Sequence, residues 1–288
     1  MNDVEAMFYE QTADYVKCGL CPWGCQLRDN GLGRCKARRS RNNRLIAESY
    51  GMITSAAMDP IEKKPLKRFH PGSFIFSIGL YGCNLHCPFC QNYQISMTKP
   101  ETTYVSPAET AALAEKYARS DNNLGVAYTY NEPLIAYEYV MDCARLVRAK
   151  GLKNAVVSNG CINRGPFEKI LPYIDAFNID LKGSDLFYKD KLGGDFETVK
   201  QNIRSAAAQC HVEVTTLVIP GENDADEEIE DEVKFLAGID PEIPLHLSRF
   251  MPQYKYAHKQ PTPRETMYRL RDIAKKYLRN VYLGNITV

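Results

Sequence analysis

Residues 73–90 read Ser73-Phe-Ile-Phe-Ser-Ile-Gly-Leu80-Tyr-Gly-Cys83-Asn-Leu-His-Cys87-Pro-Phe-Cys90. The first half of this stretch is an apolar run with β-strand character. The second half carries three cysteines, separated by three and then two residues. Three thiolates on one short loop can each hold one iron of a cubane cluster, which leaves the fourth iron without a local protein ligand. Since an open iron can bind a substrate or cofactor, the loop predicts a 4Fe-4S cluster that performs chemistry.

Two other interpretations of this loop stay open at the level of sequence. A distant thiol can supply a fourth ligand, and Cys143, Cys161 and Cys210 are the candidates, although a buried small side chain is the default for each. A structural zinc ion wants four ligands, and His86 can join the three thiols only with awkward geometry. The spacing, directly after a strand, favours the cluster over both.

From residue 73 onwards, strand-like and helix-like segments alternate. Alternation of this kind predicts a parallel sheet with right-handed crossovers. Six strands fall short of the eight of a closed barrel, so the predicted fold is α/β, a partial (β/α)6 TIM-type barrel. The predicted strands are 73–80, 124–130, 154–157, 176–181, 212–219 and 245–250. The predicted helices are 106–120, 134–149, 166–172, 195–209, 225–237 and 262–279, the first and last opening on the capping-box patterns Ser106-Pro-Ala-Glu109 and Thr262-Pro-Arg-Glu265.

Polar residues follow each predicted strand at its carboxyl end. The carboxyl ends of parallel barrel strands meet on one face, where active sites are built. We therefore expect these segments to come together at one site. They are Gly82-Cys83, Asn131-Glu132-Pro133, Ser158-Asn159-Gly160, Asp180-Leu181-Lys182, Pro220 to Asn223 and Arg249 to Pro252.

Residues 1–72 lack this alternation and are predicted to form a separate small module, followed by the barrel over 73–288. The module carries Cys18, Cys21, Cys25 and Cys35 among several glycines, and Pro60 to Pro65 is predicted to connect it to the barrel. Four soft thiolates fit either tetrahedral zinc or a second iron-sulfur cluster, and the spacing does not decide between them. Unligated thiols in a glycine-rich segment would be prone to oxidation.

The composition excludes several function classes. With 36 basic and 35 acidic side chains, the net charge of +1 gives no bias towards nucleic acid or an anionic membrane. The amino-terminal residues are acidic and lack a signal-like apolar run, and no stretch of about 18 apolar residues occurs. We expect a cytoplasmic protein, in which ten cysteines are more plausibly metal ligands or buried thiols than disulfides.

Two basic runs precede the predicted barrel, and one acidic run lies in its carboxyl-terminal half. All of them are expected to be solvated faces, and the acidic run is expected to begin a helix. For the basic runs, the alternative is docking of an acidic partner protein or an anionic substrate. The runs are Lys36, Arg38, Arg39, Arg41 and Arg44, then Lys63, Lys64, Lys67 and Arg68, and the acidic stretch 222–232.

The cysteine pattern Cys-x3-Cys-x-aromatic-Cys resembles the signature of radical SAM enzymes. The resemblance implies that the open iron chelates the methionine part of S-adenosylmethionine, and that an electron from the reduced cluster splits it to a 5'-deoxyadenosyl radical that abstracts hydrogen from a substrate. A reductant such as ferredoxin or flavodoxin is then expected. The protein contributes orientation, electrostatics and exclusion of side reactions.

The resemblance extends to other strand ends, as in the branch around pyruvate formate-lyase activating enzyme. Asn131 and Glu132 stand where the family has its Gly-Gly-Glu-Pro motif, whose carboxylate holds the methionine ammonium, although Tyr130 and Asn131 replace the two glycines. By the same resemblance, further predicted contacts to ribose, carboxylate and adenine are Ser158, Asn159, Asp180, Lys182 and the segment from Val218 to Gly221. A surface ion pair is the plain alternative for Asp180 and Lys182.

Several stretches in order resemble the AmmeMemoRadiSam-system radical SAM enzymes, over nearly the whole chain. They are the Cys18-x2-Cys21-x3-Cys25 module, Asp59 to Pro65, His70 to Ser73, Gly82 to Asn92, Tyr128 to Pro133 and Tyr282 to Asn285. The resemblance implies an enzyme that modifies an unidentified small molecule or peptide, working with a protein from the same gene system. The alternative is an activator of a glycyl-radical enzyme. The competing non-enzymatic function is iron-sulfur electron transfer.

The sequence assigns no catalytic residue beyond these contacts. Tyr130, Cys161, Arg249 and Tyr254 are expected near the mouth of the barrel without a role of their own.

Overall fold

One eight-stranded sheet organises the computed structural model, which describes residues 3–286. The strand order is β15-β14-β13-β12-β11-β10-β8-β7, and every strand runs parallel to its neighbours except β7, which pairs antiparallel with β8. The strands are β7 (Ser55–Pro60), β8 (Phe74–Gly79), β10 (Asn123–Tyr128), β11 (Lys153–Ser158), β12 (Ala176–Asp180), β13 (His211–Val218), β14 (Leu245–Arg249) and β15 (Val281–Gly284). The sheet is therefore an open, partial barrel, as predicted.

All six predicted strands are present with ends shifted by at most two residues, and two further strands flank them. The strand count of six was too low, because β15 adds a seventh parallel strand. The edge strand β7 has no buried residue and consists of Ser, Ala, Met, Asp and Pro. The sequence analysis missed it because it contains no apolar run.

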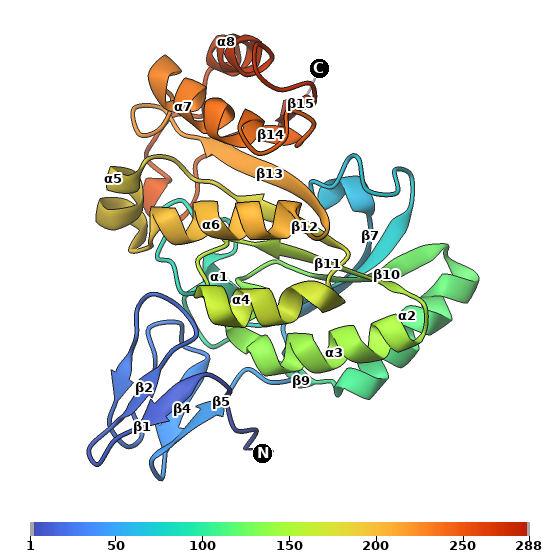
Figure 1. Ribbon diagram of the computed structural model, residues 1–288, viewed down its shortest axis with the longest axis vertical. Helices are drawn as coiled ribbons and strands as arrows, with labels where there is room; N and C mark the ends of the chain where they lie inside the picture. The colour runs from blue at the N-terminus through green and yellow to red at the C-terminus, as the bar shows by residue number, and fades with distance from the viewer. Residues whose placement is uncertain (1–2, 287–288) are drawn as a thin grey trace.

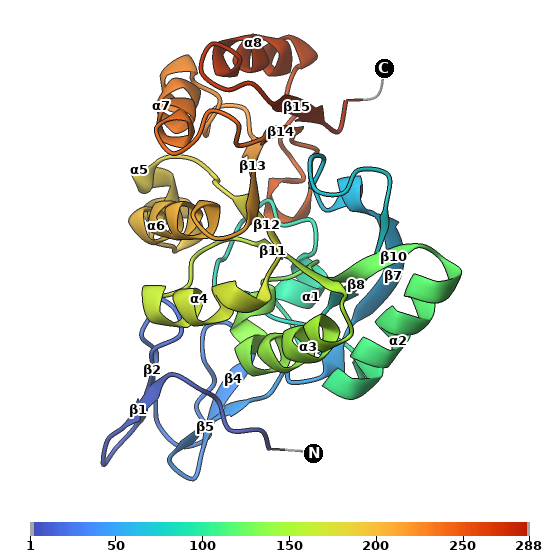
Figure 2. The ribbon, with the colours of Figure 1, turned by 45° about the vertical axis from the view of Figure 1, so that its right-hand side comes forward.

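The longer helices lie over one face of the sheet, where Figures 1 and 2 show α3, α4 and α6 side by side. They are α2 (Pro107–Ser120), α3 (Tyr137–Ala149), α4 (Arg164–Ile170), α6 (Phe196–Ala207), α7 (Asp226–Ala237) and α8 (Arg264–Ala274). The shorter ones are α1 (Tyr93–Ser96), α5 (Asp185–Phe187), η1 (Ile61–Lys63), η2 (Pro133–Ala136), η3 (Leu171–Tyr173), η4 (Tyr188–Leu192) and η5 (Tyr254–Tyr256). Within residues 3–286, none is long and apolar enough to cross a membrane.

One of the two predicted capping boxes is confirmed and the other is wrong. The Ser106 hydroxyl accepts a hydrogen bond from the Glu109 N–H, and the Glu109 carboxylate accepts one from the Ser106 N–H. Thr262 does not cap α8. Its buried hydroxyl donates to the Val218 carbonyl at 2.6 Å and accepts from the Phe250 N–H at 3.3 Å, so it joins the ends of β13 and β14 instead.

The amino-terminal residues form small antiparallel sheets at one end of the molecule (Figure 1). Their strands are β1 (Tyr9–Gln11), β2 (Val16–Cys18), β3 (Gln26–Leu27), β4 (Arg38–Arg41) and β5 (Arg44–Ala47). A further strand, β6 (Met52–Ile53), pairs antiparallel with β9 (Thr103–Tyr104), which lies between β8 and α2 in the chain. The predicted division into 1–72 and 73–288 stays a prediction, and its outer ends, 1–2 and 287–288, lie outside the described residues. The main sheet itself already begins at Ser55.

The predicted solvated face around residues 36–44 is wrong for one member. Arg38 is 1% exposed and forms an ion pair of 2.7 Å with Glu138 of α3. Its guanidinium also donates to the carbonyls of Met7 and Ile135. A buried charge is tolerated only when it is paired and hydrogen-bonded, as here, so Arg38 joins the module to the barrel.

The predicted connection, Pro60 to Pro65, and the residues that follow it pack against the main sheet. Ile61, Leu66 and Phe69 pack against a separate apolar cluster of the sheet, formed by Ile75, Ala127, Ala155 and Ala176. Small residues on this face of the sheet leave room for the three larger side chains. The segment is therefore part of the core.

A buried carboxylate anchors the same segment. Glu213 of β13 accepts hydrogen bonds from the N–H groups of Lys67 and Arg68 at 3.0 and 2.7 Å, and contacts the ring nitrogens of His211 and His246 at 2.9 and 2.6 Å. Burial alone raises the pKa of Glu213, but its hydrogen bonds with His211 and His246 outweigh burial, and the pKa is lowered to about 2.

Replacement of Glu213 by Gln is expected to lower the free energy of unfolding at pH 7 by about 3 kcal/mol, because buried donors and two histidines lose their charged partner. A carboxylate with a lowered pKa stabilises the fold above its unfolded pKa, about 4.3, and the contribution is lost as the pH falls through the folded value. Urea unfolding should therefore show the wild type losing stability between pH 4 and 2, as a rough window, and E213Q losing less. The control is Glu62→Gln, because the exposed Glu62 carboxylate also accepts a hydrogen bond from a backbone N–H. Equal losses of unfolding free energy in the two variants would contradict the role of Glu213.

Candidate functional site

A cavity of about 350 Å³ opens at the carboxyl ends of the parallel strands. All three cysteines of the loop after β8 line it, and so do residues from the ends of β10, β11 and β12. Six of the seven predicted contacts to S-adenosylmethionine are among its walls, namely Asn131, Glu132, Ser158, Asn159, Asp180 and Lys182. The topology therefore brings together the strand-end residues that were predicted to share one site. The contact of these residues with a ligand stays a prediction.

The seventh predicted contact, Val218, does not fit this picture. Its side chain is fully buried and its carbonyl is bonded to Thr262 and Phe250. The neighbouring Leu217 lines the cavity instead. Side chains alternate between the two faces of a strand, so Leu217 and Val218 point to opposite faces, and the predicted contact of the segment from Val218 to Gly221 with a ligand stays a prediction.

The cysteines of the loop have different exposures. Cys87 is buried, whereas Cys83 and Cys90 are partly buried. Burial raises the pKa of the Cys87 thiol to about 12, against the opposing positive charge of Lys182. Because a cluster binds the thiolate, bound iron has to compensate this cost of burial.

The three thiols are the donors that a cubane cluster takes. Within residues 3–286, no three His, Cys, Asp or Glu side chains are grouped around one point. Three thiolates that each bind a different iron do not need to meet at one point. His86, the candidate fourth zinc ligand, is not among the described residues that line the cavity, and its ring Nδ1 is buried without a hydrogen bond in the described structure.

Asn131 holds the loop in place. Its side-chain amide donates to the Gly82 carbonyl at 2.9 Å, and its oxygen accepts from the Leu80 N–H at 3.2 Å. Next to it, Asn92 donates to the Tyr130 carbonyl at 2.6 Å. Because both polar groups of the Asn131 side chain are hydrogen-bonded to the loop, Asn131 acts on the cavity mainly by positioning that loop.

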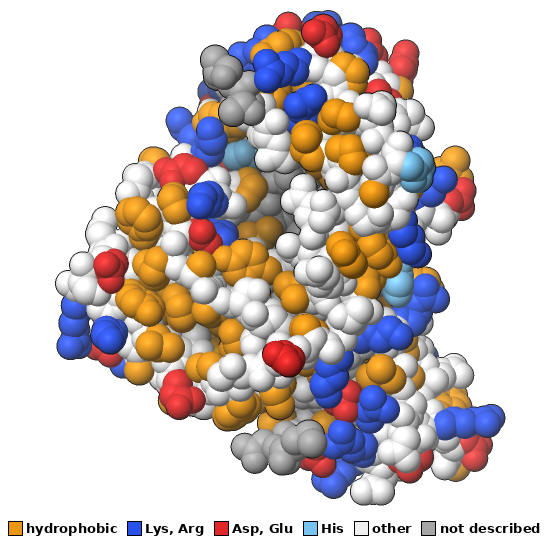
Figure 3. Space-filling view, turned by 180° about the vertical axis from the view of Figure 1, so that it is seen from behind, with side chains coloured by type: hydrophobic (Ala, Val, Ile, Leu, Met, Phe, Trp, Pro, Cys, Tyr) orange, Lys and Arg blue, Asp and Glu red, His pale blue; other side chains and the backbone are white. Residues whose placement is uncertain are grey.

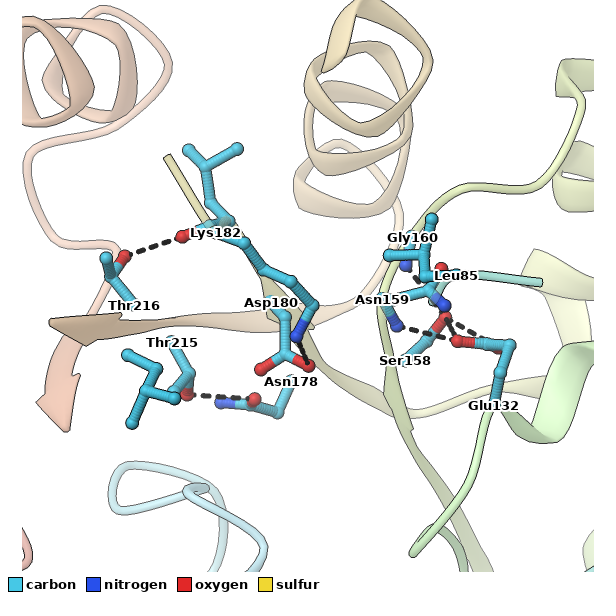
Figure 4. Close-up of polar contacts among 12 residues, drawn as sticks. Leu85, Glu132, Ser158, Asn159, Gly160, Asn178, Asp180, Lys182, Thr215 and Thr216 are labelled. Carbon is cyan, nitrogen blue, oxygen red and sulfur yellow. Dashed lines mark hydrogen bonds and ion pairs between the residues drawn. The ribbon is translucent and has the colours of Figure 1, made fainter. Parts of the chain in front are cut away.

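Glu132 lies at the centre of a hydrogen-bond network that Figure 4 shows in close-up. Its carboxylate accepts from the Ser158 hydroxyl at 2.9 Å, from the Asn159 N–H at 2.7 Å and from the Leu134 N–H at 2.9 Å. Burial raises its pKa to about 7, although these hydrogen bonds oppose the shift. The Asn159 amide in turn donates to the Cys83 sulfur at 3.5 Å, so the network reaches the cysteine loop.

Asp180 and Lys182 pair within the cavity wall rather than on the outer surface. Their charged groups are 2.8 Å apart, and their side chains are 29% and 14% exposed (Figure 4). Burial works against the charge on Lys182, yet Asp180 and Cys87 raise its pKa above the ordinary value. The pair therefore presents opposite charges to the same cavity as the thiols.

Sequence reasoning missed a second charged group at this cavity. The Lys64 ammonium, 4% exposed, lies 2.7 Å from the Asp59 carboxylate, which also accepts from the Tyr130 hydroxyl at 2.7 Å. Tyr130 has a left-handed backbone with φ 72°, which is strained for a bulky residue. Both Lys64 and Tyr130 line the cavity. The sequence analysis placed Lys64 in a basic run that was expected to be solvated, and that expectation is wrong for this residue, because its ammonium is buried and paired.

The other predicted mouth residues lie outside the cavity wall, as far as residues 3–286 describe it. Cys161 is buried, the Arg249 guanidinium donates to the Thr262 carbonyl at 2.6 Å, and Tyr254 stacks on Tyr93 at 4.5 Å. The amino-terminal cysteines are elsewhere too, around a cavity of their own.

Comparison with known proteins gives consistent findings. A sequence profile described as the radical SAM superfamily matches residues 77–236. The uncharacterised protein MJ0808 of Methanocaldococcus jannaschii is 39% identical over 289 residues, 98% of this chain and 85% of that protein. The putative glycyl-radical enzyme activating enzyme MJ1227 of the same organism is 29% identical over 222 residues, 73% of this chain and 88% of that protein. A radical SAM methyltransferase from Sphaerobacter thermophilus shares the fold, with a TM-score of 0.54 and 16% identity over 75% of this chain and 67% of that one.

The glycine before the first cysteine should be irreplaceable. Gly82 has φ 90°, and an added Cβ would lie 2.2 Å from the Cys35 carbonyl oxygen. We expect Gly82→Ala to destabilise the fold by about 2 kcal/mol or more and to lower the iron bound after anaerobic reconstitution, measured by urea unfolding and iron analysis. Gly72→Ala is the matched control, because Gly72 has φ 81° and nothing within 4 Å of the added Cβ. Equal behaviour of the two variants would refute the steric argument.

Proposed function

This chain belongs to the radical SAM superfamily, and from that premise we propose that Cys83, Cys87 and Cys90 hold a 4Fe-4S cluster at which S-adenosylmethionine is reductively cleaved. The 5'-deoxyadenosyl radical so formed abstracts hydrogen from a substrate. Members of the superfamily are enzymes, so non-enzymatic electron transfer is not retained as a function. Membership also implies the cluster and S-adenosylmethionine themselves.

The observation that supports the proposal best is the shared cavity. Three thiols of one loop and six polar residues from the ends of three other strands line it together. When bound, the reduced cluster supplies the electron for cleavage. The protein has to orient the methionine part of the ligand beside it and keep water and competing reactions away.

The charges of the cavity suit a ligand with an ammonium and a carboxylate. Glu132, ionised above its pKa of about 7, attracts the ammonium. Lys182 attracts an anionic group, and Asp180 keeps it protonated. Ser158 and Asn159 fix the Glu132 carboxylate, so their first role is positioning.

Hydrogen abstraction from an unidentified small molecule or peptide is the first candidate reaction. Lys64 favours a substrate with an anionic or carbonyl group, because the Lys64 ammonium lines the cavity beside Asp59 and Tyr130 and can bind such a group. A protein encoded in the same gene system is the expected partner.

Activation of a glycyl-radical enzyme is the second candidate. It is supported by the similarity to the putative activating enzyme MJ1227 and by 28% identity over 152 residues with the pyruvate formate-lyase-activating enzyme of Clostridium pasteurianum, 49% of this chain and 63% of that protein. In this case the hydrogen donor is a glycine of a partner protein.

An acidic reductant such as ferredoxin or flavodoxin is the proposed electron source. Arg34, Lys36 and Lys255 are exposed and act electrostatically on His86 of the cysteine loop, whose pKa is lowered by burial first and by these charges second. Figure 3 shows Lys and Arg side chains gathered along the right edge of that view. Positive charge beside a redox loop steers acidic carriers towards it.

Anaerobic reconstitution with iron and sulfide, reduction with dithionite and addition of S-adenosylmethionine should produce 5'-deoxyadenosine, detected by mass spectrometry. Cys87→Ala is expected to abolish the product, because it removes one of three iron ligands. Cys210→Ala is the matched control, since that thiol lies far from the loop in sequence, at the start of β13, and outside the cavity wall.

A wild-type protein with a full cluster that forms no 5'-deoxyadenosine would overturn the proposed function. Equal product from wild type and Cys87→Ala would overturn the assignment of the loop.

A further inference from the structure

Lys64 brings an amine to the cavity wall from the segment after η1. Its side chain is 4% exposed, and it lines the same cavity as the three cysteines of the loop. The Lys64 ammonium lies 2.7 Å from the Asp59 carboxylate and 4.5 Å from the centre of the Tyr130 ring. A buried ion pair adds little net stability, because desolvation of both charges offsets their attraction. Stability alone therefore does not account for a lysine at this position.

The backbone gives up conformational freedom to place Tyr130 beside this pair. Tyr130 has a left-handed φ of 72°, which is strained for a bulky side chain. Its ring also depends on Gly79 at the end of β8, because a Cβ added to Gly79 would lie 2.8 Å from the Tyr130 ring. The Tyr130 hydroxyl then donates to the Asp59 carboxylate at 2.7 Å. Strain of this kind clusters at functional sites, so the group of Asp59, Lys64 and Tyr130 is a candidate for chemistry.

Two features of the surroundings favour the neutral amine of Lys64. Burial lowers the pKa of Lys64, and Asp59 opposes this shift without cancelling it. The Lys63 ammonium also lines the cavity, 3.8 Å from the other oxygen of Asp59, and its charge lowers the Lys64 pKa further. Desolvation and a neighbouring cation are the two ways in which enzymes turn a lysine into a nucleophile. Lys64 therefore has the setting of a reactive amine.

We propose that Lys64 forms an imine with an aldehyde or ketone substrate and so tethers that substrate in the cavity. Asp59 takes a proton from the Lys64 ammonium, and the free amine forms a bond to the carbonyl carbon. The bond between that carbon and its oxygen then breaks. The oxygen leaves as water with the proton held by Asp59 and one proton from the nitrogen, so no oxidant or reductant is consumed.

The tethered substrate lies in the cavity that the cysteine loop also lines. The Tyr130 carbonyl accepts a hydrogen bond from Asn92, two residues beyond Cys90, at 2.6 Å, so the lysine side of the cavity is joined directly to the loop. A covalent tether removes much of the entropy cost of positioning a carbon–hydrogen bond for abstraction. This use of the tether rests on the proposed function, whereas imine formation at Lys64 does not.

Reductive trapping tests the imine without S-adenosylmethionine. The anaerobically reconstituted protein is mixed briefly at neutral pH with limiting glyoxylate and sodium cyanoborohydride, and the modified lysines are located by peptide mass spectrometry. Lys64 should be modified several-fold faster than the exposed Lys275, because more of its amine is neutral. In Lys64→Arg, which keeps a cation beside Asp59, this fast labelling should be lost. Modification of Lys64 no faster than Lys275 overturns the proposal, whether or not the protein makes 5'-deoxyadenosine.

Lys63→Gln tests the activation of Lys64 by its neighbour. Loss of the Lys63 ammonium, whose side chain is 70% exposed, should slow trapping at Lys64 several-fold and leave trapping at Lys275 unchanged. Lys67→Gln is the matched control, because it removes an exposed charge from the same segment that is not among the charges acting on Lys64. Equal trapping at Lys64 in Lys63→Gln and the wild type overturns the role given to Lys63.

Asp59→Asn separates proton transfer from simple pairing. If Asp59 only pairs with Lys64, its loss speeds trapping, because Asp59 holds the Lys64 pKa up. If Asp59 carries the protons, its loss slows trapping several-fold even though more of the amine is neutral. We expect slower trapping at Lys64 in a variant that urea unfolding shows to be folded, and faster trapping overturns the proton transfer by Asp59.

Discussion

The loop between β8 and α1 depends on hydrogen bonds that reach it from three directions. Asn131 holds its start from β10, Asn159 donates to Asn84 and to the Cys83 sulfur from β11, and the Cys35 carbonyl accepts from the Cys83 N–H. These contacts put three thiols at the edge of the sheet where the parallel strands end. A loop fixed in this way can present an open iron to a ligand at low cost in entropy, because little ordering remains to be done on binding.

Another part of the cavity wall carries strain and buried charge. Tyr130 keeps a left-handed backbone at a position where glycine would be unstrained, and its hydroxyl donates to Asp59 beside the buried Lys64 ammonium. Such an arrangement persists only where the surrounding structure enforces it, here through Asp59 of β7 and the packing of Ile61 and Leu66 on the sheet. The cavity is therefore built by the edge of the sheet as much as by its central strands.

The buried strands and the meeting of their polar ends were predictable, because apolar runs and parallel topology place Glu132, Ser158 and Asp180 on one edge. Contacts between distant segments were not. Lys64 lies 66 residues from Tyr130, and Arg38 lies 100 residues from Glu138, so neither pairing leaves a local pattern. Thr262 carried the pattern of a helix cap, but burial gave its hydroxyl other partners, and burial cannot be read from four residues.

The binding of S-adenosylmethionine to an open iron is the central claim, and electron-nuclear double resonance tests it most directly. The reduced protein would be frozen with ligand carrying 17O in its carboxylate or 15N in its amine. The account predicts hyperfine coupling from both labels to the cluster, present in the wild type and lost with Cys87→Ala. A reduced, fully loaded wild-type cluster that shows no coupling to either label would contradict the claim that three cysteines leave one iron free for this ligand.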